Sequence, residues 1–170
     1  GREETTTLCL IPSVRKATSL PLLAAGGIAT GESMLAAMAL GADGVQIGTR
    51  FALTHESSAH SSFKQYCLGL NEGETRLMLK KLAPTRLAKN EFFAEVEEAE
   101  NRGASVEEMK DLLGKGRAKK GIFEGDLIEG ELEIGQIAAL INECPTVENV
   151  MHQLILSFNQ AAERIASVRF

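Results

Sequence analysis

The chain has 170 residues, of which 18 are Lys or Arg and 23 are Asp or Glu, so its formal net charge is −5 at pH 7. Hydrophobic residues make up 44% of the chain, which is typical of a globular protein rather than of a disordered or fibrous one. The mild acidity argues against a nucleic-acid partner, and the apolar stretches at 20–29 and 34–41 are too short to span a bilayer, so no membrane partner is expected.

The chain start and the cysteines indicate the setting of the protein. Residues 1–4 contain no initiator Met and no signal-peptide pattern, so we expect a mature segment, a fragment or a truncated piece. Three cysteines, Cys9, Cys67 and Cys144, cannot all pair within one chain and show no metal-ligand spacing. We therefore expect no metal site and a reduced, cytoplasmic location in which the cysteines act as small apolar side chains.

The first half of the chain is predicted to alternate helices and strands. Continuous apolar runs that end in glycine are typical of parallel strands buried on both faces. In chain order, the expected elements are a helix within 5–19, a strand at 20–25, a helix at 34–40 with helix-start residues at 30–33, a strand at 44–48 and a helix at 57–70. Repeated βα units with right-handed crossovers bring the ends of both strands to the same edge of a sheet.

The second half is richer in charged and helix-favouring residues. In chain order, we expect a third strand at 75–80, a chain break at Pro84, and helices at 90–101, 105–113, 135–142 and from 146 onwards. Ser105 and Thr146 are the expected N-caps of two of these helices. The last helix carries an apolar stripe at helical spacing, which we expect to pack into the core, a partner-helix surface being the alternative. The stripe consists of Val147, Val150, Met151, Leu154, Ile155, Phe158, Ala162 and Ile165.

Two glycine turns follow the two expected strands. The first glycine turn contains Gly26 and Gly27, and the second contains Gly48 and Thr49. Glycine lets the backbone approach a ligand closely, and backbone N–H groups at a strand end can bind a phosphate. Either turn alone could simply close a βα connection. The pair, one βα unit apart, favours a phosphate site of the kind that late loops of (β/α)8 barrels form.

Two stretches around these turns resemble a known family. The sequences PLLAAGGIATG at 21–31 and AMALGADGVQIGTRF at 37–51 are similar to the nitronate monooxygenase family, formerly called 2-nitropropane dioxygenases. That family also includes FMN-dependent enoyl-acyl-carrier-protein reductases. FEGDL at 123–127 and GQIAALI at 135–141 support the resemblance.

The resemblance implies a fold. The chain would be an α/β protein forming the C-terminal portion of a (β/α)8 TIM barrel with an added helical segment. Residues 1–83 would supply the later βα units of the FMN-binding barrel, and 84–145 a helical insertion with the return to the barrel. Residues 146–170 would form a C-terminal helix.

The resemblance also implies site residues. FMN would be bound by Gly1, Ala25, Gly26, Gly27, Gln46, Ile47, Gly48 and Thr49. The family's proposed catalytic base, a His in a Gly-Gly-His motif, would precede Gly1, so no catalytic residue is assigned within this segment. Gly135 and Gln136 match a family motif near the mouth of the active site, but no role is assigned to them.

Three functions follow as expectations. The first is an FMN-dependent monooxygenase, an oxidoreductase flavoprotein that oxidises alkyl nitronates with O2. The alternative is an FMN-dependent enoyl-acyl-carrier-protein reductase in which NAD(P)H is the electron donor. The third is a non-catalytic barrel fragment that acts through protein contacts. The expected partner is a small-molecule substrate, a nitronate or an enoyl thioester, and a homodimer remains open.

Two charged features keep two interpretations each. The basic cluster, Lys115, Arg117, Lys119 and Lys120, is expected to be a solvated face, the alternative being contact with a cofactor phosphate or an acidic carrier protein. Arg50, next to the second glycine turn, could form a salt bridge or contact the phosphate.

Overall fold

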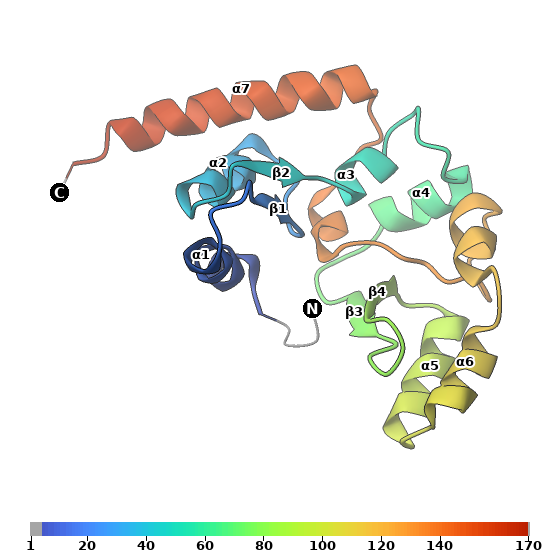
Figure 1. Cartoon of the computed structure of the whole chain (residues 1–170). Coiled ribbons are helices and arrows are strands. Elements are labelled where there is room, and N and C mark those ends of the chain that lie inside the picture. The colour runs from blue at the N-terminus through green and yellow to red at the C-terminus, as the bar shows by residue number, and fades with distance from the viewer. Residues whose placement is uncertain (1–4, 170) are drawn as a thin grey trace. The chain divides into compact units, whose positions relative to one another are not determined.

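A computed structural model describes residues 5–169 of the chain (Figure 1). The described residues divide into two compact units. One, here called the insert, is continuous and covers 57–144, and the other, the discontinuous unit, combines 5–56 with 145–169. These units do not coincide with the segments 1–83, 84–145 and 146–170, which remain a prediction about places in a whole barrel.

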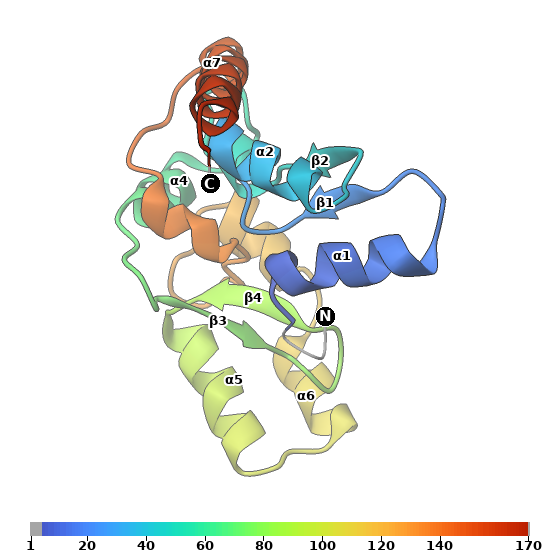
Figure 2. The same cartoon turned by 90° about the vertical axis from the view of Figure 1, so that its left-hand side faces the viewer.

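The discontinuous unit is built around two parallel strands. Strand β1 (Leu23–Ala25) pairs with β2 (Gly44–Gln46) in the register Leu23↔Gly44, Ala24↔Val45 and Ala25↔Gln46. Helix α2 (Gly31–Ala39) connects the strands, and α3 (Thr49–Ala52) follows β2. Helices α1 (Thr7–Ala17) and α7 (Val147–Ala166) lie on opposite sides of α2 and the strand pair (Figures 1 and 2). The predicted βαβ order is therefore present.

The amino ends of β1 and β2 are joined by a polar network, and β1 is shorter than the predicted strand. The Asp43 carboxylate accepts a hydrogen bond from Leu22 N–H at 2.8 Å and pairs with Arg15 at 3.0 Å. Hydrogen bonding from Leu22, followed by the charge of Arg15, holds the pKa of Asp43 below its usual value. Pro21 has no N–H to give to a ladder, so regular pairing begins only after it.

Helix α2 begins within the predicted helix-start residues, and its start has a capping box. The Thr30 hydroxyl accepts from Ser33 N–H, and the Ser33 hydroxyl accepts from Thr30 N–H. The core below it is made of small and aliphatic side chains: Ile11, Ala24, Ile28, Ala37 and Ala42.

The apolar stripe of the last helix is only partly buried. Helix α7 packs against α2, and Val150, Leu154 and Ala161 of α7 are buried. Met151, Ile155 and Ile165 are 43%, 52% and 57% exposed, so the expectation that the whole stripe packs into the core is wrong. Helix α2 has 9 residues and α7 has 20, so α2 covers only part of α7.

The insert has its own sheet, which differs from the prediction. The third strand exists as β3 (Thr75–Met78), but it forms an antiparallel hairpin with β4 (Thr85–Ala88), which the sequence analysis missed. Pro84 does not separate two parts of the chain as predicted. It lies directly before the first residue of β4, where the missing N–H of proline costs no ladder hydrogen bond.

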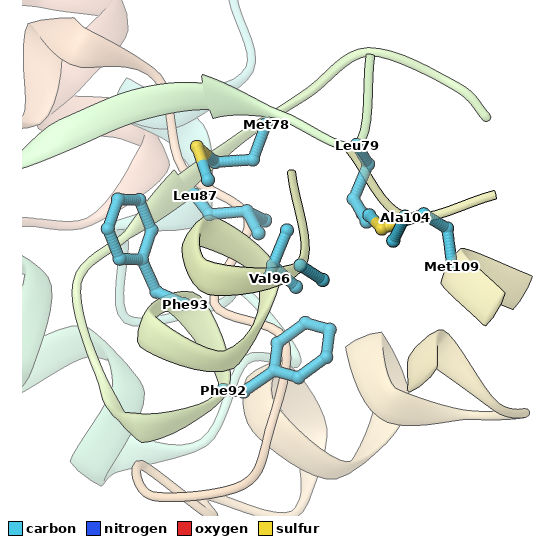
Figure 3. Close-up of a cluster of buried hydrophobic side chains, with 9 residues drawn as sticks. Met78, Leu79, Leu87, Phe92, Phe93, Val96, Ala104 and Met109 are labelled. Carbon is cyan, nitrogen blue, oxygen red and sulfur yellow. The ribbon is translucent and has the colours of Figure 1, made fainter. Parts of the chain in front are cut away.

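The insert also contains helices and helical turns. They are α4 (Ser61–Leu68), α5 (Glu91–Asn101), α6 (Val106–Leu113), the π-helical turn η1 (Lys119–Phe123) and the 3₁₀ turn η2 (Gln136–Leu140). Figure 3 shows Met78 and Leu87 of the strands facing Phe93 and Val96 of α5. Ser105 caps α6 in a capping box and Thr146 caps α7, as predicted. No helix of the part that the structure describes is long and apolar enough to cross a membrane.

Candidate functional site

The two glycine turns lie at the same edge of the parallel pair. Because Ala25 is in register with Gln46, the chain leaves β1 at Gly26 and β2 at Ile47, both at the carboxyl ends of the strands. Ala25, Gly26, Gly27, Gln46 and Gly48 are exposed, while Ile47 and Thr49 are half-buried. Seven of the eight predicted cofactor-binding residues therefore lie in two adjacent segments, and Gly1 is outside the described residues.

The first glycine turn needs glycine for its backbone. Gly26 and Gly27 have φ values of +99° and +73°, a region that side chains rarely adopt. The turn is held by a hydrogen bond from the Thr7 hydroxyl of α1 to the Gly26 carbonyl at 3.0 Å. A Cβ on Gly26 would meet no protein atom within 4 Å. The space in front of this turn is thus open.

The second glycine turn does not need glycine for its backbone. Gly48 has φ −96°, which any residue can adopt, and a Cβ there would again meet nothing within 4 Å. Neither strain nor packing within the described protein explains a glycine here, whereas close approach of a ligand would. Helix α3 begins directly after it, at Thr49. The sequence analysis missed α3 because a single turn of helix carries no periodic signal.

Arg50 follows the second glycine turn and is buried, with 7% of its surface exposed. Its Nη2 donates to Gln153 Oε1 on α7 at 3.1 Å. The guanidinium thus keeps a fixed positive charge two residues from Gly48, which favours an anion nearby. This hydrogen bond joins Arg50 to a neutral amide, so it is neither of the two expected contacts, and the salt bridge and the phosphate contact stay predictions.

Helix α7 also contacts the start of α2. Gly31 N–H donates to Ser157 Oγ at 2.9 Å. A Cβ on Gly31 would overlap the α7 backbone at Leu154 O and Phe158 N. Glycine is therefore required at this position by the close approach of the two helices.

Two motifs of the predicted family lie in the insert. Asp126 of FEGDL accepts from Glu129 N–H and Ile128 N–H, both at 2.9 Å, and these bonds lower its pKa. It therefore shapes a turn as a carboxylate and is a poor candidate for a general acid. Gly135 precedes η2 in extended conformation, and its role with Gln136 remains unassigned.

The basic cluster is largely engaged inside the insert. Lys120 pairs with Asp126 at 3.1 Å and with Glu129 at 2.5 Å, and Lys119 pairs with Glu124 at 3.1 Å. The Arg117 guanidinium lies 4.5 Å from the centre of the Phe92 ring. Lys115 and Lys119 are exposed, as expected for a solvated face, whereas Arg117 and Lys120 are half-buried and make local contacts.

The sequence analysis missed a buried carboxyl group at Glu131, which is only 6% exposed. Burial, followed by the neighbouring Glu133 carboxylate, raises the pKa of Glu131 to about 7, partly offset by Arg117. Its segment continues the hairpin, because Ala88 N–H donates to Leu132 O and Ile134 N–H donates to Arg86 O. In the alternating sequence ELEI, the pattern assigns both glutamates to a solvent face, so no sequence signal separates Glu131 from Glu133.

Cysteines and metal ligands add no further chemistry among the described residues. Cys67 is fully buried, and burial raises the pKa of its thiol to about 12, so it is an apolar side chain as expected. Cys144 is half-buried and Cys9 is exposed, so the expectation is wrong for Cys9. Within 5–169, no group of three or more His, Cys, Asp or Glu side chains could hold a metal ion.

Comparisons with known proteins agree on one family. A family model described as nitronate monooxygenase matches residues 1–157. A probable nitronate monooxygenase of Bacillus subtilis is 32% identical over 155 residues, which are 91% of this chain and 44% of that protein.

Solved structures are also similar. FabK from Thermotoga maritima is 33% identical with a TM-score of 0.88, over 96% of this chain and 52% of FabK. Nitroalkane oxidase from Streptomyces ansochromogenes is 30% identical with a TM-score of 0.74, over 94% and 45%. The chain thus spans about half the length of these proteins. The likenesses confirm the predicted fold class, an α/β chain consistent with part of a (β/α)8 barrel.

Proposed function

The chain belongs to the nitronate monooxygenase family, and on that premise we propose that it forms the phosphate-binding part of an FMN-dependent oxidoreductase. The observation that carries the proposal is the pair of glycine turns at one edge of β1 and β2, with open space at Gly26 and Gly48. Neighbouring loops and a short helix at the carboxyl edge of a (β/α)8 barrel commonly bind a phosphate group.

The residues of the two turns fit a phosphate. Backbone amides of residues 25–27 and 46–49 would donate to its oxygens, because no Cβ stands in front of Gly26 or Gly48. The buried charge of Arg50 would favour the dianion, and the Thr7 hydroxyl would keep the first turn in place through Gly26 O. FMN, when bound, would supply two-electron chemistry. The chain itself would anchor and orient the cofactor.

The proposed reaction is the oxidation of an alkyl nitronate with O2. The resemblance places the family's catalytic His ahead of Gly1, so this chain's residues would contribute cofactor binding rather than proton transfer. The name of the Bacillus subtilis relative, a probable nitronate monooxygenase, supports this assignment.

A second candidate is the reduction of an enoyl thioester with NAD(P)H as electron donor. The likeness to FabK, with a TM-score of 0.88 against 0.74 for nitroalkane oxidase, favours it. Rapid-mixing experiments that follow flavin bleaching would separate the two. Bleaching by NADPH supports the reductase, and bleaching by a nitronate without a response to NADPH supports the monooxygenase.

The cofactor assignment is tested by the substitution Gly48→Val in the full-length protein. The new side chain would fill the space of the phosphate and should abolish FMN binding, measured by equilibrium dialysis and flavin absorbance. Its melting temperature without FMN should stay near that of the wild type, because the Cβ meets no protein atom.

Gly69→Val is the matched control. Gly69 has φ −91°, and a Cβ there would be 3.5 Å from its nearest neighbour, so the variant should fold and bind FMN normally. Unchanged FMN affinity in Gly48→Val would refute the proposed site. A flavin-free wild-type protein that unfolds cooperatively would instead support a non-catalytic fragment acting through protein contacts.

A further inference from the structure

Helix α7 contacts the segments that follow both glycine turns. Gln153 accepts from Arg50 Nη2 at 3.1 Å, and Ser157 accepts from Gly31 N–H at 2.9 Å. Gln153 and Ser157 are four residues apart, so they lie on the same face of α7, one turn from each other. One helix face therefore connects α3 with the start of α2.

Both connections are close to the turns along the chain. Arg50 is two residues after Gly48, and Gly31 is four residues after Gly27. Burial of Arg50 restricts its rotamers, and the contact at Gly31 leaves no room even for a Cβ. A displacement of α7 would therefore move the two turns relative to each other.

The start of α7 is hydrogen-bonded to residues 55 and 56, which follow α3 in the chain. Val147 N–H donates to the two Glu56 carboxylate oxygens at 2.9 and 3.0 Å, and His55 N–H donates to Pro145 O at 2.9 Å. These contacts set where α7 begins relative to the segment after α3. Gln153 and Ser157 thereby face α3 and α2 at defined positions along the helix.

We propose that Gln153 and Ser157 are positioning residues that set the separation of the two glycine turns for a shared phosphate group. The inference rests on the proposed function, because it concerns the same phosphate. A phosphate held from two sides loses affinity when the turns shift by a fraction of an ångström. Contacts with the ring system of a flavin would not depend on this separation.

The experiment compares the binding of FMN with that of riboflavin, which lacks the phosphate, to the full-length protein. Dissociation constants of both flavins are measured by fluorescence titration for the wild type, Gln153→Ala and Ser157→Ala. Each variant should weaken FMN about three- to tenfold, the usual effect of one hydrogen bond, while riboflavin affinity stays constant. Ser157→Thr, which keeps the hydroxyl, should restore the wild-type ratio.

Asn159→Ala is the matched control, because Asn159 is an exposed amide two residues after Ser157 and therefore on another face of the same helix. Alanine favours helix, and melting without flavin verifies that each variant folds. If the ratio of FMN to riboflavin affinity stays unchanged in both variants, including by an equal loss for both flavins, the inference is overturned while the proposed function stands. A wild-type protein that binds neither flavin overturns the proposed function and this inference together.

Discussion

The two units differ in how they bury apolar side chains. The insert has a core of large side chains, in which Phe92, Val96 and Met109 are at most 1% exposed. The discontinuous unit combines aliphatic side chains such as Ile11 and Ile28 with small ones such as Ala24 and Ala37, and it leaves large apolar side chains of α1, β1 and α7 exposed. Close backbone approach occurs in both units, at Gly31 in the discontinuous unit and between Gly121 and Gly130 in the insert, but the core rich in aromatic rings belongs to the insert.

This difference has a physical reason. Small residues allow α2 and α7 to approach each other closely and hold the glycine turns in place, but they remove little apolar surface from water. Large side chains in the insert gain more from burial, and each leaves a large cavity when it is removed. Substitutions should thus have different signatures in the two units.

The largest effect is expected for Phe92→Ala in the insert. The ring is 1% exposed and lies beneath the Arg117 guanidinium, so truncation leaves a cavity and removes a cation–π contact. The free energy of unfolding should fall by about 3–5 kcal/mol, measured by urea denaturation. Phe123→Ala, at a ring that is 50% exposed, should change it little. Equal losses in the two variants would contradict the described core.

A smaller effect is expected for Gly31→Ala in the discontinuous unit. The added methyl group overlaps the α7 backbone, so α2 and α7 must separate, at a cost of about 1–3 kcal/mol. Thermal and urea unfolding without flavin would measure it. Gly48→Ala in the same unit should be nearly neutral, because its Cβ meets no protein atom. A neutral Gly31→Ala would show that the helices are less tightly packed than described.

Most elements of the discontinuous unit were predictable because their signals are local. Apolar runs ending in glycine predicted β1 and β2, and Thr146 marked the start of α7. The glycine turns meet at one edge because parallel pairing with a helical crossover leaves no other arrangement. The site residues could thus be placed before the structure, although their contact with FMN remains a proposal.

Other features were not predictable because tertiary contacts decide them. The antiparallel partner of β3 begins one residue after Pro84, which resembles a break in isolation. The stripe on α7 reads as one apolar face, yet the shorter helix α2 covers only part of it. Glu131 and Glu133 carry the same pattern, and only the three-dimensional neighbours of the segment decide which carboxyl group is buried.

The smallest effect is the pH dependence of the insert. The pKa of Glu131 is raised in the folded protein from 4.5 to about 7, so the folded state holds its proton more tightly than the unfolded chain. Stability from this group is therefore fully present below pH 4.5 and is lost as the pH rises to about 7. The loss should reach about 1–2 kcal/mol, because solvent relaxation and Arg117 offset part of the burial cost.

Glu131→Gln tests this pH dependence, because the amide keeps the size of the side chain and cannot ionise. Urea denaturation at pH 5 and pH 7.5 should show the wild type losing stability relative to the variant as the pH rises. Glu107→Gln, at an exposed position of α6, should follow the wild type at both pH values. A wild type and a Glu131→Gln variant with parallel pH profiles would mean that Glu131 ionises freely. The insert would then tolerate a buried charge, and the contrast with the discontinuous unit would rest on side-chain volume alone.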